Sequence, residues 1–180
     1  MKATGIVRRI DELGRVVIPK EIRRTQRIRQ GDPLEIFTTG DGEVIFKKYS
    51  PIGELADFAG QYTAVLSRAL GAPSFVCDRD NIVAVAGAGR RELTEKRVSA
   101  PLERVMEERR AFYHSGRAAE CLFPCEGSAR HVLAAAPIVA AGDVVGAVGL
   151  LSEQKAAAPA PEQCKAVEIA AAFLAKQMEE

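Results

Sequence analysis

Apolar and polar positions follow two different patterns along the chain, and the change falls near residue 50. Before it, short runs rich in Val and Ile alternate with turns that contain Gly and Asp, which is typical of short strands. After it, apolar residues recur every three or four positions over residues 55–70, which predicts an amphipathic helix. We therefore expect a first domain over residues 1–50 and a second domain over residues 51–180.

The first domain is expected to consist of short strands and one short helix. The predicted strands cover residues 5–10, 15–18, 34–38 and 44–47, and the predicted helix runs from residue 20 to about residue 27. A domain of about 50 residues is near the lower limit for an independent core. The run from Arg15 to Ile18 does not alternate between polar and apolar residues, so we expect this strand to be covered on both faces. We infer an obligate dimer in which a second copy completes the core.

The second domain is predicted to be an α+β sheet domain flanked by its first and last helices. Predicted strands cover residues 74–77, 82–86, 112–113, 132–139 and 144–151, and further helices cover about 99–110 and 161–180. Ser50 before Pro51 suits a helix N-cap, and Gly71 suits the C-cap. The strands over 132–139 and 144–151 are apolar throughout, so helices are expected on both faces of the sheet.

Composition narrows the protein class. The 180 residues are 47% apolar and 27% charged, which excludes a disordered tail, a collagen-like fibre and a disulfide miniprotein. No run approaches the roughly 18 apolar residues that cross a bilayer. The N-terminus has no continuous apolar block of the secretory kind, so we expect a cytoplasmic protein with its four cysteines as free thiols.

Charge is divided unevenly between the two domains. Residues 1–50 carry eleven Lys or Arg and seven Asp or Glu, a net charge of +4, whereas residues 51–180 carry 14 and 17, a net charge of −3. This division favours a polyanion-binding head on a neutral or acidic body. The alternative is a charged surface that is merely solvated.

The short helix is the most informative element of the first domain. At 100° per residue, four basic side chains share one face, and Ile22 lies on the opposite side. The four are Lys20, Arg23, Arg24 and Arg27. Three arginines on the adjoining strands extend this cluster, namely Arg8, Arg9 and Arg15. These seven residues are our candidate DNA-binding set, because Lys and Arg neutralise phosphate and Arg also binds guanine edges. The alternative is an exposed amphipathic helix without a ligand.

Residues 4–25, with 34–37 and 44–49, closely resemble the AbrB-type swapped-hairpin DNA-binding domain. The resemblance implies a dimeric β-barrel of interleaved strands that binds double-stranded DNA with loose sequence preference and regulates transcription. It assigns DNA contacts to Arg8, Arg9, Arg15, Arg23 and Arg24. Gln26 replaces the Leu of many members, which leaves the basic face intact.

The second domain resembles a GAF domain. Together with the head, the chain resembles the family of stage V sporulation protein T through residues 77–80, 146–148 and 171–175. The resemblance implies activation and repression of forespore genes, and a homotetramer joined through the flanking helices of the GAF-like domain. It leaves open whether a small molecule binds. Residues 115–131 match least, and a ligand site is expected there.

Catalytic signals are weak, and we expect no enzyme, no cofactor and no metal. Gly87–Arg90 lacks the third glycine of a dinucleotide fingerprint and is better interpreted as a turn. Potential zinc ligands are Cys121 and Cys125 with His114 and His131. The two cysteines are closely spaced, but the histidines do not form the second closely spaced ligand pair of a zinc motif.

Two other functions stay open. Some GAF-fold proteins reduce methionine sulfoxide with cysteines. A redox enzyme that uses Cys77, Cys121 and Cys125 is therefore an alternative function. Cys77 lies in an apolar strand, where a cysteine usually acts as a small hydrophobic residue, which argues against it. The roles of these three cysteines and of Cys164 are not assigned. The first alternative to a transcription factor is an antitoxin-like regulator, which a folded domain of about 130 residues disfavours, since antitoxins usually carry a short flexible tail.

Overall fold

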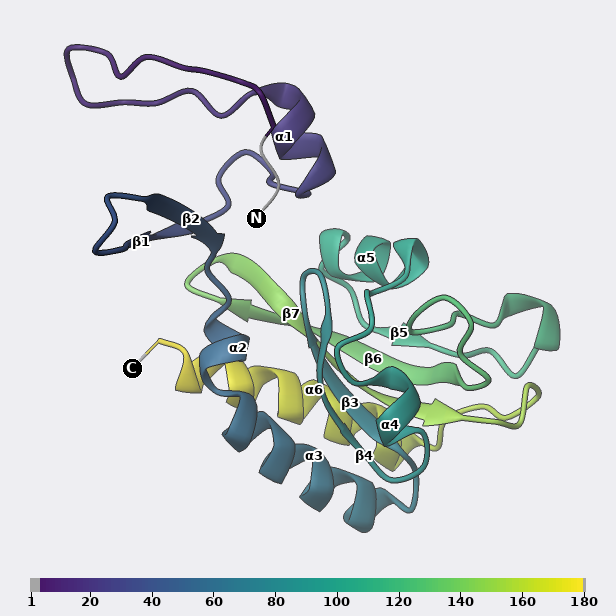
Figure 1. Cartoon of the computed structure of the whole chain (residues 1–180). Coiled ribbons are helices and arrows are strands. Elements are labelled where there is room, and N and C mark those ends of the chain that lie inside the picture. The colour runs from purple at the N-terminus through teal and green to yellow at the C-terminus, as the bar shows by residue number, and fades with distance from the viewer. Residues whose placement is uncertain (1–3, 180) are drawn as a thin grey trace. The chain divides into compact units, whose positions relative to one another are not determined.

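The chain folds into two compact units, Met1–Tyr49 and Ser50–Glu180, which we call the head and the body. The computed structural model describes residues 4–179. The head contains α1 (Lys20–Thr25), β1 (Leu34–Thr38) and β2 (Val44–Lys48). The body contains α2 (Pro51–Glu54), α3 (Ala56–Leu70), β3 (Ser74–Asp78), β4 (Ile82–Ala86), α4 (Arg90–Leu93), α5 (Ala100–Glu107), β5 (Phe112–Tyr113), the 3₁₀ turn η1 (Ala118–Glu120), β6 (His131–Ala140), β7 (Asp143–Ser152) and α6 (Pro161–Gln177) (Figure 1).

The hairpin predicted in the second half of the head is present. Strands β1 and β2 pair in antiparallel register, with Leu34 opposite Lys48. The N–H of Thr39 donates to the carbonyl of Glu43 at 3.0 Å and closes the turn between the strands. A hairpin of two strands is marginal on its own, so it cannot by itself supply the core of the head.

Residues 4–19 differ from the prediction. They form an extended segment with one turn, in which the N–H of Asp11 donates to the carbonyl of Arg15 at 3.0 Å. The strands predicted over 5–10 and 15–18 are wrong for the single chain, because no ladder forms there, and its two-stranded sheet is not a closed barrel. Residues 4–19 have no ladder partner within one chain, so strands there would require a second copy.

The body is built on a five-stranded antiparallel sheet in the order β4-β3-β7-β6-β5. All five strands predicted from the sequence are present. The two longest, β6 and β7, join through a tight turn in which Ala141 and Gly142 both have positive φ, 49° and 87°. This is the turn geometry that matches the twist of paired strands.

Both faces of this sheet are covered, as the apolar strands predicted. Helices α3 and α6 lie across one face, and α4 and α5 lie on the other (Figure 1). Strand β3 serves both cores, because Val76 points to the α3–α6 side while Phe75 and Cys77 point to the α4–α5 side. The second core also contains Leu122 and Cys125 from an irregular segment, so helices are not its only cover.

Helix boundaries in the body follow the predicted capping residues. The Ser50 hydroxyl accepts a hydrogen bond from the Gly53 N–H at 3.0 Å and donates one to Asp78 Oδ2 at 2.9 Å. Gly71 ends α3 in the left-handed conformation at φ 62°. Within residues 4–179 no helix is both long enough and apolar enough to cross a membrane.

We expect Gly146→Ala to destabilise the body, because β7 passes too close to its neighbours for a side chain. A Cβ at this position would collide with the Cys77 carbonyl oxygen and lie 2.5 Å from Ile52 Cδ1. The expected loss is about 1–3 kcal/mol in the free energy of unfolding, measured by urea denaturation. As a control, Gly60→Ala in α3 meets nothing within 4 Å and should gain roughly 0.5–1 kcal/mol. Equal stabilities of the two variants would contradict the close packing.

Candidate functional site

Helix α1 presents a basic surface. It begins directly after Pro19, whose carbonyl accepts the Arg23 N–H at 2.9 Å. Lys20, Arg23 and Arg24 are exposed, while Ile22 is half-buried on the other side. The side chains of these three basic residues have no ion-pair partner within the described part of the chain. Three positive charges are therefore available to an anionic partner.

Arg27 does not share this helical face. The predicted helix extends to about residue 27, but α1 ends at Thr25 with Gln26 as its cap. Arg27 adopts a left-handed backbone with φ 51° and is half-buried. Its carbonyl accepts a hydrogen bond from Lys48 Nζ at 2.9 Å, which ties the end of α1 to β2. The placement of Arg27 on the helix face was therefore wrong.

Arg8, Arg9 and Arg15 lie on the exposed segment before α1. Arg15 Nε donates to Asp11 Oδ2 at 2.8 Å, and the Arg15 N–H donates to Asp11 Oδ1 at 2.8 Å. These hydrogen bonds, the backbone one first, hold the pKa of Asp11 below its ordinary value. The Arg15 side chain remains 71% exposed, so its other guanidinium nitrogens can still reach phosphate.

The head leaves most of its apolar side chains uncovered. Pro19 is the only buried residue among residues 4–49. Six apolar side chains are more than half exposed: Val7 at 84%, Ile10 at 71%, Leu13 at 74%, Val17 at 71%, Ile36 at 61% and Val44 at 58%. So many exposed Val and Ile residues in one small unit mark an association surface rather than scattered surface positions.

The outer side of α3 and α6 carries an aromatic cluster. Tyr62 and Phe173 stack with ring centroids 5.5 Å apart, and Phe58 lies 6.3 and 6.1 Å from them. Val65 and Ile169 extend the cluster and are 65% and 58% exposed. We call these five residues the helix patch. An apolar patch across two neighbouring helices is a second candidate association surface.

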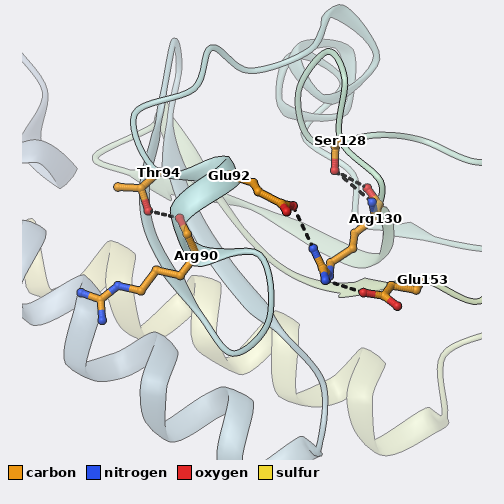
Figure 2. Close-up of polar contacts among 6 residues, drawn as sticks. All are labelled: Arg90, Glu92, Thr94, Ser128, Arg130 and Glu153. Carbon is orange, nitrogen blue, oxygen red and sulfur yellow. Dashed lines mark hydrogen bonds and ion pairs between the residues drawn. The ribbon is translucent and has the colours of Figure 1, made fainter.

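An arginine bridge joins α4 to the start of β6 and the end of β7 (Figure 2). Arg130 Nη1 donates to Glu92 Oε2 at 3.1 Å, and Arg130 Nη2 donates to Glu153 Oε1. Its side chain is only 12% exposed, and Ser128 Oγ both accepts from its N–H and donates to its carbonyl. One guanidinium thus joins α4, the residue before β6 and the residue after β7.

The glycine-rich segment at residues 87–90 is a turn, as predicted. Gly87 and Gly89 have positive φ, and α4 begins directly after them. A Cβ on Gly89 would lie 2.7 Å from Arg130 Nη1, so this glycine makes room for the arginine bridge. Close packing therefore accounts for these glycines, and a phosphate-binding role is not needed to explain them.

Two of the three cysteines considered for redox chemistry are poor nucleophiles. Cys77 and Cys125 are buried, and burial raises the pKa of both thiols. Cys121 differs, because it is partly exposed and its Sγ lies 3.7 Å from His114 Nε2. His131 lies beside this pair, so the structure gathers three of the four residues considered for zinc and leaves Cys125 out. Spacing along the chain did not reveal this trio, because His131 lies ten residues beyond Cys121.

Comparisons with known proteins agree with both units. The family profile described as "Stage V sporulation protein T C-terminal, transcription factor" matches residues 54–179. The chain is 51% identical to Stage V sporulation protein T of Bacillus subtilis (strain 168) over 180 residues, which is 100% of both proteins. The chain belongs to the stage V sporulation protein T family. This confirms the resemblance expected from the sequence for the whole chain.

The head of this stage V sporulation protein T family member has relatives of its own. The chain is 54% identical over 63 aligned residues to the Transition state regulatory protein AbrB of Bacillus subtilis (strain 168), a match that covers 32% of this chain and 65% of that protein. A second family profile, "Antidote-toxin recognition MazE, bacterial antitoxin", matches residues 7–53. The AbrB-type assignment of the head is confirmed.

The body of this family member has the GAF fold. It is similar to the GAF domain of a phosphoenolpyruvate-protein phosphotransferase from Coxiella burnetii, with a TM-score of 0.54, 17% identity, and coverage of 69% of this chain and 82% of that one. At this identity the likeness concerns the fold alone. The GAF-like sheet domain predicted from the sequence is therefore confirmed.

We expect Arg15→Ala to raise the pKa of Asp11 without returning it to the ordinary value. The substitution removes the Nε hydrogen bond but keeps the Arg15 N–H, which contributes most to the lowering. A carbon-13 NMR titration of the Asp11 carboxylate measures this shift. Arg24→Ala, which removes a charge that does not contact Asp11, should leave the pKa unchanged. An identical Asp11 pKa in wild type and Arg15→Ala would show that the guanidinium does not hold the turn.

Proposed function

We propose that this member of the stage V sporulation protein T family regulates sporulation genes by binding double-stranded DNA as a homotetramer. It activates some forespore promoters and represses others, and it works in the cytoplasm, where bacterial DNA lies. The observation that supports DNA binding most is the exposed basic face of Lys20, Arg23 and Arg24, in a chain that is 54% identical to AbrB over 63 residues. The proposed domains are residues 1–50 for DNA binding and 51–180 for assembly and sensing.

The proposed DNA contacts are Arg8, Arg9, Arg15, Lys20, Arg23, Arg24 and Arg27. Six of the seven side chains are exposed, and Arg27 is half-buried. Their chemistry suits phosphate oxygens, which position a protein on DNA without specifying sequence. A loose sequence preference that depends on the shape and flexibility of the duplex follows from such contacts.

Dimerisation of the head is the first assembly step that we propose. Exposed side chains such as Val7, Ile10 and Val17 bury apolar area only when another copy covers them. A second copy would also supply ladder partners for residues 5–10 and 15–18. Pairing two heads doubles the number of basic side chains that one duplex meets.

Association of bodies through the helix patch is the second assembly step. Val65, Ile169 and Phe173 of the patch are exposed, and a two-fold axis lets the same surface meet itself. Dimeric heads joined by dimeric bodies give a tetramer with two DNA-binding surfaces. Such linkage raises the overall affinity for DNA because the second contact becomes intramolecular.

We assign no catalytic activity. Burial raises the pKa of Cys77 and Cys125, which argues against a thiolate pair there. Binding of a small molecule by the body stays a prediction. Residues 115–131, where we expect such a site, contribute Leu122 and Cys125 to the core on the α4–α5 face of the sheet.

The test of DNA binding is a salt titration with a promoter-length duplex. We expect Arg23→Ala and Arg24→Ala each to weaken binding, because each removes a phosphate contact. The slope of log K against log salt should flatten by about 0.9 for each lost contact, or about 1.8 when both heads of a dimer carry the change.

The matched control is Arg110→Ala, which removes the same charge from an exposed position in the body. Its affinity and salt slope should equal those of the wild type. If neither head variant changes the slope while the wild type binds, the α1 face does not contact phosphate. If the wild type fails to bind at moderate salt, the basic face serves another partner.

Assembly through the helix patch is tested by Val65→Glu. Val65 is 65% exposed, so a carboxylate there should leave the fold of the body intact but prevent two patches from meeting. We expect sedimentation to show dimers in place of tetramers, and affinity for a long duplex to fall about 10-fold or more. Ala100→Glu, at an exposed position in the first turn of α5, adds the same charge on the other face of the sheet and should remain tetrameric. A tetrameric Val65→Glu protein would place the interface elsewhere.

A second candidate function is favoured by the antitoxin profile over residues 7–53. In that case the chain would bind its DNA together with a small toxin. Recovery of a stoichiometric small partner protein with the purified chain would support this candidate, whereas a pure tetramer that binds DNA alone would favour the regulator.

A further inference from the structure

Three metal-ligating side chains meet in the body at a place that DNA binding and assembly do not use. His114 follows β5 directly, Cys121 follows η1, and His131 is the first residue of β6. No two of their ligand atoms are more than 4.8 Å apart. His114 and His131 are 2% and 1% exposed, whereas Cys121 is partly open to solvent.

The His114 ring is oriented for metal binding. Its Nδ1 lies 2.8 Å from the Ala157 carbonyl oxygen, which can only accept, so Nδ1 carries the proton. The N–H of Gly116 also points at this nitrogen from 3.2 Å, a contact that would suit an unprotonated Nδ1. The shorter contact decides the tautomer, because without a proton on Nδ1 two lone pairs would face each other at 2.8 Å. The Nε2 lone pair then faces Cys121 Sγ. A histidine that donates one nitrogen to a backbone carbonyl and offers the other to an ion is the common arrangement at metal sites.

His131 provides the independent observation. Its Nε2 is buried and has no hydrogen-bond partner in the described part of the chain. The ring lies against the His114 ring, with centroids 4.6 Å apart. A hydrogen bond between Cys121 and His114 alone would leave this nitrogen unsatisfied, and buried unsatisfied nitrogens are uncommon in folded proteins.

Distances within the trio suit a tetrahedral ion. Zinc bonds of about 2.3 Å to sulfur and 2.0–2.1 Å to nitrogen place two such ligand atoms about 3.6 Å apart. Cys121 Sγ and His114 Nε2 are 3.7 Å apart. The other two pairs of ligand atoms lie no more than 4.8 Å apart, at most about 1.2 Å beyond the sulfur–nitrogen value and about 1.5 Å beyond the nitrogen–nitrogen value of about 3.3 Å. Small side-chain rotations can close such gaps.

We propose that His114, Cys121 and His131 form a binding site for Zn²⁺ or a divalent ion of similar softness. One thiolate with two imidazoles is a donor set that favours zinc over magnesium or calcium. Binding replaces the thiol proton of Cys121 with a zinc–sulfur bond and releases that proton to solvent. Three protein ligands leave a fourth position for water or an exchangeable small ligand, on the solvent side of Cys121.

The site joins segments that are distant in sequence. Ala157 and Lys155, whose carbonyls contact His114 and Cys121, belong to the connection between β7 and α6. An ion held by this trio would therefore fix the segment after β5, the start of β6 and the approach to α6 at one point. None of these contacts involves the basic residues of the head, so the site stands or falls independently of DNA binding.

The experiment uses the full-length chain without a histidine tag, reduced and stripped of metal by a chelator. Zn²⁺ alone is titrated in competition with a chromogenic chelator, and Co²⁺ is titrated as a spectroscopic probe. We expect one ion per chain, proton release on binding, and a thiolate-to-cobalt charge-transfer band. A wild-type chain that shows no charge-transfer band, or binds well below one ion per chain, overturns the proposal without any variant.

Variants then test the ligand set. Cys121→Ser and His131→Asn should each lose more than about 100-fold in Zn²⁺ affinity, beyond the loss typical of residues that only orient a ligand. Cys164→Ser, at a partly buried cysteine in α6, should bind like the wild type. Circular dichroism confirms that each variant is folded. Wild-type affinity in Cys121→Ser, or loss in Cys164→Ser, would exclude this trio as the site.

Discussion

The apolar side chains of the head have no cover within their own chain, and the proposed function of the protein depends on how that surface is buried. With only Pro19 buried among residues 4–49, the head lacks the core that a domain of its size needs. A second copy would meet both needs at once, because it would cover the exposed apolar side chains and supply hydrogen-bond partners for the strands predicted over residues 5–10 and 15–18. In the proposed dimer the same pairing would bring two basic helices to one duplex, so a requirement of folding would also produce the DNA-binding surface.

The body buries its apolar core residues within its own chain. Its sheet has a core on each face, and β3 contributes alternate side chains to both. Gly146 and Gly149 in β7 lack a side chain, and this allows neighbouring strands and side chains to pack so closely that a Cβ at either position would collide with them. The exposed helix patch is then an addition to an already complete fold. In the proposed assembly, head and body therefore associate for different physical reasons, the head to complete its core and the body to link dimers.

Much of this architecture could be predicted from the sequence. The predicted caps at Ser50 and Gly71 and the apolar runs of β6 and β7 are local signals, and the structure places their elements where the sequence predicts them. The strands predicted over residues 5–10 and 15–18 are absent from the single chain, and in the proposed dimer they would form only with a partner chain. Neither the arginine bridge of Arg130 nor the trio around His131 has a local signal, since both bring together residues that only the folded sheet makes neighbours.

The uncovered apolar surface of the head also has a genetic consequence. If heads fold only in pairs, a chain with an intact Val7–Val17 surface but without Arg23 and Arg24 would still pair with normal chains. Mixed dimers would then carry one basic face instead of two. In a cell that expresses both copies, the defective allele would reduce the activity of the normal one, and such interference would be dominant. An allele whose product cannot pair at all would leave the normal dimers unaffected, so its defect would be recessive.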